Sequence, residues 1–392
     1  MVVGSWKLGV GPKGRWKLGV FSVVTLLALP GLVQAQQTAA APTETKVSVS
    51  GYVQPRYDRY TEFGETTDRV FLRRAIVAVQ ADLAGPWEAE LQLDAGPAAS
   101  NGARLLVKDA VVRYTGWASR GLTIAIGNQK VPFSQSNLQS ASRRSLVERP
   151  FTGDSEFGSP GRSITLAADG WHRRKTIHWT AALGSTHHSP DPAAIGLEGI
   201  TRSDDDWFQG RTLAGRVEFH PFAQIPRAQG DLERGPVRFV LAAAAYRWNN
   251  DDDVPAPDGS AVDPRHVTGL ELSGGLRGAG ASIDVEYERI ASRAEDPLVS
   301  SGLYVAGEAD LDKASIEAGY MLWRNHLEAT GALDAIDTEA YATPWRRVSI
   351  GMNWYVHGHA LKFSVTHRES FNDQGVRNVR SRATYVQSHF AF

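Results

Sequence analysis

Residues 87–94 read Trp-Glu-Ala-Glu-Leu-Gln-Leu-Asp, an unbroken alternation of apolar and polar side chains. Because side chains point to opposite faces at every step of an extended backbone, Trp87, Ala89, Leu91 and Leu93 share one face. This period-two alternation predicts a β-strand with one apolar and one polar face. The same pattern recurs over residues 282–288, 347–354 and 361–366. No convincing helix-period segment interrupts these strands, and the sequence therefore predicts an all-β fold.

The connections between the predicted strands are of two kinds. Tight turns are indicated by the glycines of residues 85–86, 278–280 and 357–359. Long polar segments occupy residues 129–161, 185–207 and 249–264. Short turns that alternate with long loops are typical of a transmembrane antiparallel β-barrel, whose periplasmic turns are short and whose extracellular loops are long.

The number of strands tests this barrel hypothesis, because a bacterial barrel needs an even number. Seventeen segments qualify, and residues 302–311 are the one that we interpret as part of a loop. Sixteen strands remain. The candidates are residues 46–60, 69–83, 87–95, 105–115, 122–128, 162–170, 175–184, 209–219, 236–248, 265–277, 281–290, 302–311, 313–323, 326–336, 346–356, 360–369 and 379–392.

Aromatic residues near the strand ends favour a membrane barrel over a soluble β-sandwich, because Trp and Tyr gather at membrane interfaces. The chain also ends in a strand whose last residue is Phe392, which resembles the signal read by the barrel assembly machinery. The number of strands is too large for one small sandwich. The tryptophans that we assign to interfaces are Trp117, Trp171, Trp248, Trp323, Trp345 and Trp354.

The first 35 residues predict a cleaved export signal, with a basic start, an apolar stretch and a small-x-small cleavage site at residues 33–35. Residues 36–45 then form a short flexible segment, and residues 46–392 the barrel. After residue 35, no run reaches the roughly 18 apolar residues of a transmembrane helix. Loss of the signal leaves 38 Lys and Arg against 43 Asp and Glu, a mildly acidic chain that does not suggest nucleic-acid binding. There is no cysteine. We therefore expect a bacterial outer-membrane protein.

Several short stretches resemble the phosphate-selective porin O/P family. The resemblance lies in Gly51-Tyr52 with Arg56-Tyr57, Phe71 to Ala75, Lys108 to Tyr114, Gly127 to Ser134 and Glu148-Arg149, and it is closest over residues 50–170. It implies a sixteen-stranded barrel that is usually trimeric and whose third extracellular loop folds inward. It also implies basic residues along a constriction and uptake of phosphate or related anions. Outer-membrane lipids and lipopolysaccharide would surround such a barrel.

Arginine offers an independent argument for anion transport. A guanidinium group stays charged and can bind phosphate oxygens through two hydrogen bonds, and rings of basic side chains select anions. After the signal, the chain has 32 Arg and only 6 Lys, although a GC-rich genome would produce the same bias. Strand parity and the long segment after residue 129 give the candidate constriction residues. The alternative is that these residues are solvated loop charges or ion-pair partners that do not contribute to anion selection. They are Arg143, Arg144, Arg149, Lys130, Arg74, Arg113 and Arg162.

Acidic residues weaken the case for strict anion selectivity. By the same parity, a set of carboxylates should face the lumen, where many would pair with arginine. The loop runs 204–206 and 251–253 are all aspartate, and would repel anions if they crowd the mouth. A general, weakly selective porin is therefore the alternative. The inward carboxylates are Glu88, Glu90, Asp94, Asp109, Asp284, Glu286, Glu288 and Glu317.

Enzymatic motifs are absent from the sequence. No nucleophile elbow, phosphate-binding loop or zinc-protease motif occurs, and the histidines at 187–188 and 357–359 lack further ligands at metal-site spacing. We therefore expect no catalytic residues, no metal and no cofactor. A hydrolase built on an outer-membrane barrel and a secreted β-rich binding protein are the alternatives from other classes.

Overall fold

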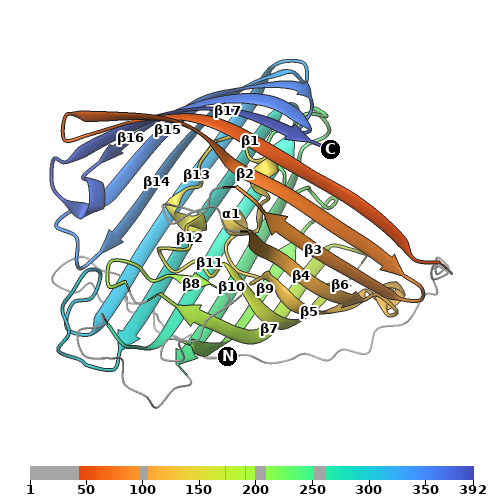
Figure 1. The fold of residues 1–392 in the computed structure, drawn as a ribbon, viewed down its shortest axis with the longest axis horizontal. Helices are drawn as coiled ribbons and strands as arrows, with labels where there is room; N and C mark the ends of the chain where they lie inside the picture. Colours follow the sequence, from red (N-terminus) through yellow and green to blue (C-terminus); the bar gives the residue numbers. More distant parts are fainter. Residues whose placement is uncertain (1–43, 97–104, 173, 190, 199–208, 251–261) are drawn as a thin grey trace, which may run out of the picture. The chain divides into compact units, whose positions relative to one another are not determined.

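The structure is a computed structural model that describes residues 44–96, 105–172, 174–189, 191–198, 209–250 and 262–392. The predicted export signal, most of the predicted flexible segment and both aspartate runs lie outside these residues. Over the described chain, sixteen long strands follow one another (Figure 1). They are β1 (Lys46–Glu62), β2 (Glu65–Leu83), β3 (Trp87–Asp94), β4 (Leu106–Tyr114), β5 (Leu122–Lys130), β6 (Arg162–His172), β7 (Ile177–His188), β9 (Gln209–Phe219), β10 (Arg238–Asn250), β11 (Pro264–Gly278), β12 (Ala281–Ala294), β13 (Glu308–Trp323), β14 (Leu327–Thr338), β15 (Trp345–His357), β16 (Leu361–Phe371) and β17 (Arg380–Ala391).

Other regular elements are short. A two-residue strand, β8 (Leu197–Glu198), pairs with the end of β7. Within the ranges that the structure describes, helix is confined to single turns: α1 (Gln135–Leu138), η1 (Ala118–Arg120), η2 (Ala141–Arg143), η3 (Phe151–Gly153) and η4 (Asp373–Gly375). Among the described residues, no helix has the length and apolar character needed to cross a membrane.

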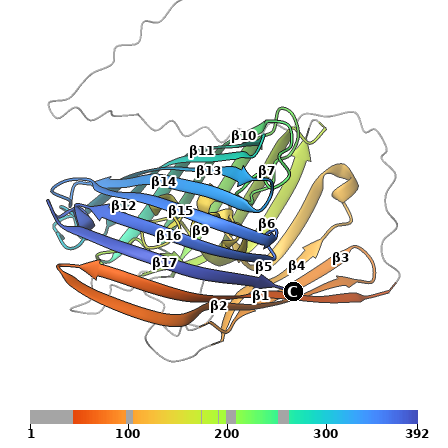
Figure 2. The same ribbon diagram turned by 90° about the horizontal axis from the view of Figure 1, so that it is seen from above.

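The sheet closes on itself. Each long strand pairs antiparallel with its neighbours in the sequence, and β1 also pairs with β17, from Tyr52 opposite Ala391 to Glu62 opposite Ser381. Figure 2 shows β17, β1 and β2 side by side at this seam. Closure leaves no open sheet edge, so the backbone groups of every spanning strand find partners within the sheet. The predicted sixteen-stranded barrel is confirmed.

The surplus seventeenth segment is explained by its glycines. Gly302 and Gly307 have φ values of +59° and +72°, and the chain turns at both instead of remaining extended. Between them, Leu303 and Tyr304 are each 2% exposed and pack in an apolar cluster. Residues 302–307 therefore belong to the connection before β13, and residues 308–311 are the first residues of that strand.

The two faces of the sheet differ in polarity as the alternation predicted. On β12, Ile283 and Val285 are 37% and 43% exposed, whereas Asp284 and Glu286 are 6% and 5% exposed. Apolar side chains therefore point out of the barrel and carboxylates point into it, the reverse of a soluble protein. This polarity is suited to lipid outside and polar groups inside.

Three of the six tryptophans assigned to interfaces are correctly placed: Trp117, Trp323 and Trp354 are exposed on the outer surface. The other three assignments are wrong. Trp248 is fully buried and donates from Nε1 to the Thr186 carbonyl (2.9 Å). Trp345 packs on Phe151, and Trp171 stacks on His178 with ring centroids 4.4 Å apart. Strand parity places all three tryptophans on the inward face. Their position near a strand end, on which the assignment rested, does not tell the inward face from the outward face.

Connections alternate between the two ends of the barrel. One end has short turns, such as residues 279–280 between β11 and β12 and residues 358–360 between β15 and β16. The other end has long connections, including residues 131–161 and 295–307. Residues 220–237, between β9 and β10, depart from this pattern because this long connection lies at the end of the short turns. Residues 63–64, between β1 and β2, are a short turn at the opposite end.

The outward face yields a first prediction. Leu272, near the middle of β11, is 63% exposed, and Leu272→Arg would place a charge in the lipid midplane. We expect the free energy of unfolding to fall by about 2–4 kcal/mol in urea titrations of the barrel in lipid vesicles, followed by tryptophan fluorescence. The control is Leu298→Arg in the connection 295–307, where the side chain is 85% exposed. An equal loss in both variants would contradict a lipid-facing position for Leu272.

Candidate permeation site

Residues 131–161, called the inner loop from here on, contact inward-facing side chains of β11 to β16. The backbone N–H groups of Ser134 and Phe151 donate to the carboxylates of Glu271 (2.7 Å) and Asp334 (3.2 Å). Figure 1 shows α1, which belongs to this loop, surrounded by strands. Because buried backbone donors need acceptors, the inward carboxylates serve as anchors for the loop.

Arg144 reinforces this anchoring. Its guanidinium forms an ion pair with Glu317 (2.8 Å), and the two side chains are only 2% and 6% exposed. The ammonium group of Lys362 donates to the Arg144 carbonyl (2.5 Å). Arg144 is one of the candidate constriction residues, but its charge is neutralised at the wall of β13. Its place in the structure is that of an anchor for the inner loop.

Aromatic rings fix the outer part of the inner loop. Phe133 packs edge-on against Tyr246 of β10 with centroids 4.8 Å apart, and the Tyr246 hydroxyl donates to the Gly158 carbonyl (2.6 Å). Phe151 and Phe157 pack against each other and against Trp345 of β15. These ring contacts hold the inner loop against the wall of β10 and β15.

The opposite side of the inner loop is basic. Arg149 is surrounded electrostatically by Arg144, Arg74 and Arg162. Burial, together with these like charges, lowers the pKa of Arg149 to about 9, so the group remains cationic at neutral pH. Its Nε has no hydrogen-bond partner among the described residues. A half-buried cation with an unused donor is a feature that attracts an anion.

Glu148 lies next to Arg149, Arg74 and Arg162, which are called the basic cluster from here on. It forms an ion pair with Arg56, and Arg73 lies 3.8 Å from the same carboxylate oxygen. Burial alone would raise the pKa of Glu148, but the charges of Arg56, Arg73 and Arg74 outweigh it and lower the pKa to about 2. Arg56 also pairs with Asp58, so it is Arg73 and Arg74 that leave an excess of positive charge around Glu148.

Arg56 and Arg73 are functional candidates that the sequence analysis missed. Arg56 lies on the inward parity of β1, between Gln54 and Asp58, and this alternation was a signal that could have identified it. Arg73 could not be found by parity. The pairing of β1 with β2 shifts by one residue between Gln54 and Pro55, which leaves Arg73 opposite no partner. Such a bulge re-aims a side chain, and both Arg73 and its neighbour Arg74 contact inward groups.

The remaining candidates are dispersed. Lys130 donates to three consecutive carbonyls at the end of α1, those of residues 137–139, at 2.6–3.1 Å. Arg162 forms two hydrogen bonds with Asp109, at 3.0 and 2.9 Å. Lys130 therefore helps to hold the loop, and Arg162 is largely neutralised by its partner.

Arg113 and Arg143 also differ in their surroundings. Arg113 of β4 pairs with Glu90 of β3 at 2.9 Å, and the two side chains are 31% and 16% exposed. Arg143 is exposed, and its backbone carbonyl accepts a hydrogen bond from Gln229 (2.9 Å). Of the seven candidates, Arg74 and Arg149 form the centre of the basic cluster and Arg162 lies at its edge.

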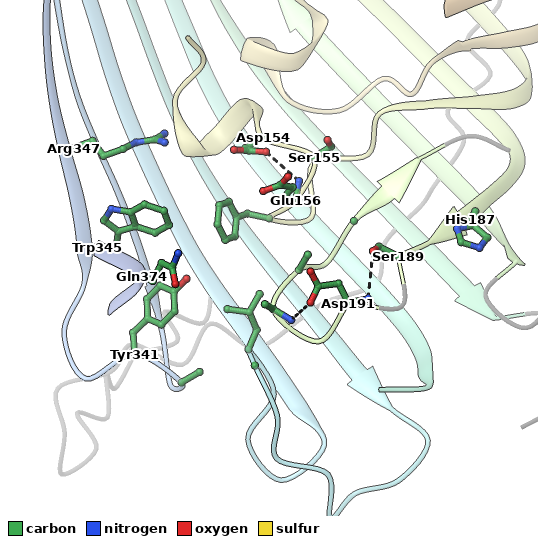
Figure 3. Close-up of a pocket in the computed structure, with 17 residues that line it drawn as sticks. Asp154, Ser155, Glu156, His187, Ser189, Asp191, Tyr341, Trp345, Arg347 and Gln374 are labelled. Carbon is green, nitrogen blue, oxygen red and sulfur yellow. Dashed lines mark hydrogen bonds between the residues drawn. The ribbon is translucent and has the colours of Figure 1, made fainter. Parts of the chain in front are cut away.

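A second feature is a cavity of about 760 Å³ towards the end with long connections (Figure 3). Its lining combines the carboxylates of Asp154, Glu156 and Asp191 with the rings of Tyr341 and Trp345. The lining residues come from the inner loop, from residues 187–196, from the connections before β13 and β15, from β15 itself and from η4. The cavity is therefore a more acidic environment than the basic cluster.

No group of three or more His, Cys, Asp or Glu side chains is arranged to hold a metal ion in the part of the chain that the structure describes. No curated protein matches the sequence. Solved structures resemble the fold. An anion-selective porin from Comamonas acidovorans has a TM-score of 0.60 at 11% identity, covering 89% of this chain and 100% of that one.

Two further outer-membrane structures are similar. The outer membrane channel DcaP of Acinetobacter baumannii has a TM-score of 0.56 at 11% identity over 92% of this chain and 100% of that one. A trimer form of OmpT from Vibrio cholerae has a TM-score of 0.55 at 10% identity over 89% of this chain and 100% of that one. At these identities the likeness establishes the fold alone.

The family comes from the sequence comparison. Residues 49–286, more than half of the chain, match the profile of the family described as phosphate-selective porin O and P. This region contains the basic cluster and the inner loop, together with the stretches whose resemblance to the family was noted from the sequence. The chain therefore belongs to the phosphate-selective porin O and P family, and it is a channel of the bacterial outer membrane.

Proposed function

We propose that this channel conducts small anions, with phosphate-like oxyanions preferred, through the space between the inner loop and the wall of β1 to β5. In this proposal the inner loop is the third extracellular loop of the family and forms the constriction. The observation that carries the proposal is the excess of guanidinium groups around Glu148 and Arg149. We assign Arg73, Arg74, Arg143 and Arg149 to the constriction, with Arg56 as a supporting charge.

Electrostatics gives the size of the expected effect. A unit charge roughly 7 Å from a permeating ion contributes about 0.6 kcal/mol in water, which is about threefold in the partition of a monovalent ion. Several uncompensated guanidinium groups therefore suffice for anion preference. Phosphate would gain further, because guanidinium groups donate pairs of hydrogen bonds to its oxygens.

A weakly selective porin is the second candidate function. It is favoured by the ion pairs of Arg113 with Glu90 and of Arg162 with Asp109, which neutralise two of the candidate cations. The carboxylates of the outer cavity also favour it, because they would repel an approaching anion. Reversal potentials in a KCl gradient, together with block of the chloride current by phosphate, distinguish the two functions.

We infer three further properties of the mature protein. It would begin after residue 35, assemble as a homotrimer, and be recognised by the barrel assembly machinery through Phe392. The Phe392 backbone exchanges hydrogen bonds with Gly51, and its side chain is 69% exposed, which leaves the ring accessible. Outer-membrane lipids and lipopolysaccharide would contact the apolar outer face. Cross-linking of the detergent-extracted protein tests the trimer.

Neutralising the basic cluster should reduce anion preference. For the triple variant Arg73→Gln, Arg74→Gln and Arg149→Gln, we expect the chloride-to-potassium permeability ratio to fall by threefold or more, on the order of the effect of one charge. Planar-bilayer reversal potentials measure this ratio. The matched control replaces three outward-facing arginines by glutamine: Arg289, Arg293 and Arg346. An unchanged ratio in the first triple variant would reject the assignment of the constriction.

The depressed pKa of Glu148 gives a pH-dependent prediction. Because this pKa is about 2, the carboxylate stays ionised at pH 4, where an ordinary glutamate is largely protonated. Glu148→Gln should raise the anion preference, and the difference from the unmodified protein should be the same at pH 7 and pH 4. Glu308→Gln, on the outer face, is the control. A difference that falls by more than half between pH 5 and pH 4 would show that Glu148 titrates normally.

A further inference from the structure

The connection between β9 and β10, residues 220–237, is called the inner turn from here on. It lies at the end of the barrel where other connections are short, yet it is long and enters the interior. Ile225, Gln229 and Asp231 of this segment are 5%, 3% and 5% exposed. Exposed turns do not bury side chains to this extent, so the inner turn is packed inside the barrel wall.

Gln229 connects the inner turn to the inner loop. Its backbone N–H donates to the Arg143 carbonyl (2.9 Å), and its side-chain oxygen accepts from the Ser145 N–H (2.8 Å). The side-chain amide of Gln229 also donates to Asp284 (3.2 Å) and to Glu317. One residue therefore joins the inner loop, which carries Arg143, to the carboxylates of β12 and β13.

Residues on either side of Gln229 also bind the barrel wall. Arg227 forms an ion pair with Glu218 of β9 (2.8 Å), and the carbonyl of Ala228 accepts from Arg277 of β11 (3.0 Å). The Asp231 carboxylate accepts from the Gly280 N–H (2.7 Å). These contacts join the inner turn to the wall at three separate strands or turns.

The inner turn covers three carboxylates of the barrel wall. Asp284 and Glu317 lie beneath Gln229, and Glu328 lies beside Gly230. The three are at most 6% exposed. Asp284 pairs with Arg277 and Glu317 with Arg144, and without the inner turn water would reach the three carboxylates and weaken these ion pairs. Hydrated carboxylates attract cations, and a path along them would let cations pass without meeting the basic cluster.

We propose that the inner turn is a selectivity element: it seals the acidic wall of β12 to β14 from the conducting path and holds Arg143 in position through Gln229. The channel would thus owe its anion preference to two inward segments, one that contributes cations and one that hides carboxylates. This inference rests on the proposed function, because it presupposes anion conduction along the basic wall.

Shortening the inner turn tests the inference. Replacement of residues 223–234 by a short Gly-Asn-Gly turn should raise the single-channel conductance. The same change should lower the chloride-to-potassium permeability ratio by about threefold, the effect of one exposed charge at roughly 7 Å. Gln229→Ala should move both quantities in the same direction by less. The control is Glu233→Gln, an exposed position in the same segment.

Rescue distinguishes exposure of carboxylates from general loosening. In the shortened channel, Asp284→Asn and Glu317→Gln together should restore the permeability ratio. Because these changes also free Arg277 and Arg144, the same pair of substitutions in the full-length channel is the control, and a merely loosened barrel would give an equal rise of the ratio in both channels. A lack of rescue would overturn the inference. If the shortened chain does not fold, the Gln229→Ala variant tests the inference instead. An unchanged reversal potential in that variant would then overturn the inference. A lack of anion preference in the unmodified channel refutes the proposed function instead, and an anion-selective channel indifferent to these changes refutes only the role of the inner turn.

Discussion

Every backbone hydrogen-bonding group inside a lipid bilayer needs a partner within the protein, and this constraint governs the whole molecule. The pairing of β1 with β17 meets it by removing the last sheet edge. A closed sheet of sixteen strands encloses a wide interior, and side chains alone do not fill such a space. The chain fills part of it with its own backbone, and the inward carboxylates then become acceptors for that backbone.

This use of carboxylates reconciles an acidic interior with anion transport. Glu271 and Asp334 accept hydrogen bonds from the inner loop, and Glu317 pairs with Arg144. These acids are therefore occupied on one side of the lumen. Arg149 lies with Arg74 and Arg162 on the other side, where Glu148 is a partner for several guanidinium groups. Acidic and basic side chains are thus separated across the lumen, which the net charge of the chain does not reveal.

The strands were predictable because alternation is a local property. The stretch 282–288 identified β12, and parity correctly turned Arg74 inward. Tertiary contacts were not predictable in this way. Arg73 turns inward only because the pairing of β1 and β2 shifts, and the fate of Arg144 depends on Glu317, far away in the sequence. The inner turn has the composition of any polar connection, and nothing local indicates that Gln229 will be buried.

The packing of the inner loop constrains the order in which the barrel is built. Phe133, Phe151 and Phe157 belong to a cluster of rings and aliphatic side chains from strands β8 to β15 and the connections between them, far from the seam. A sheet that is still open between β1 and β17 can already hold them, whereas a completed cylinder would have to admit three phenylalanines through its mouth. We therefore expect the pairing of β1 with β17 to be the last step of assembly, after the inner loop has packed in the lumen.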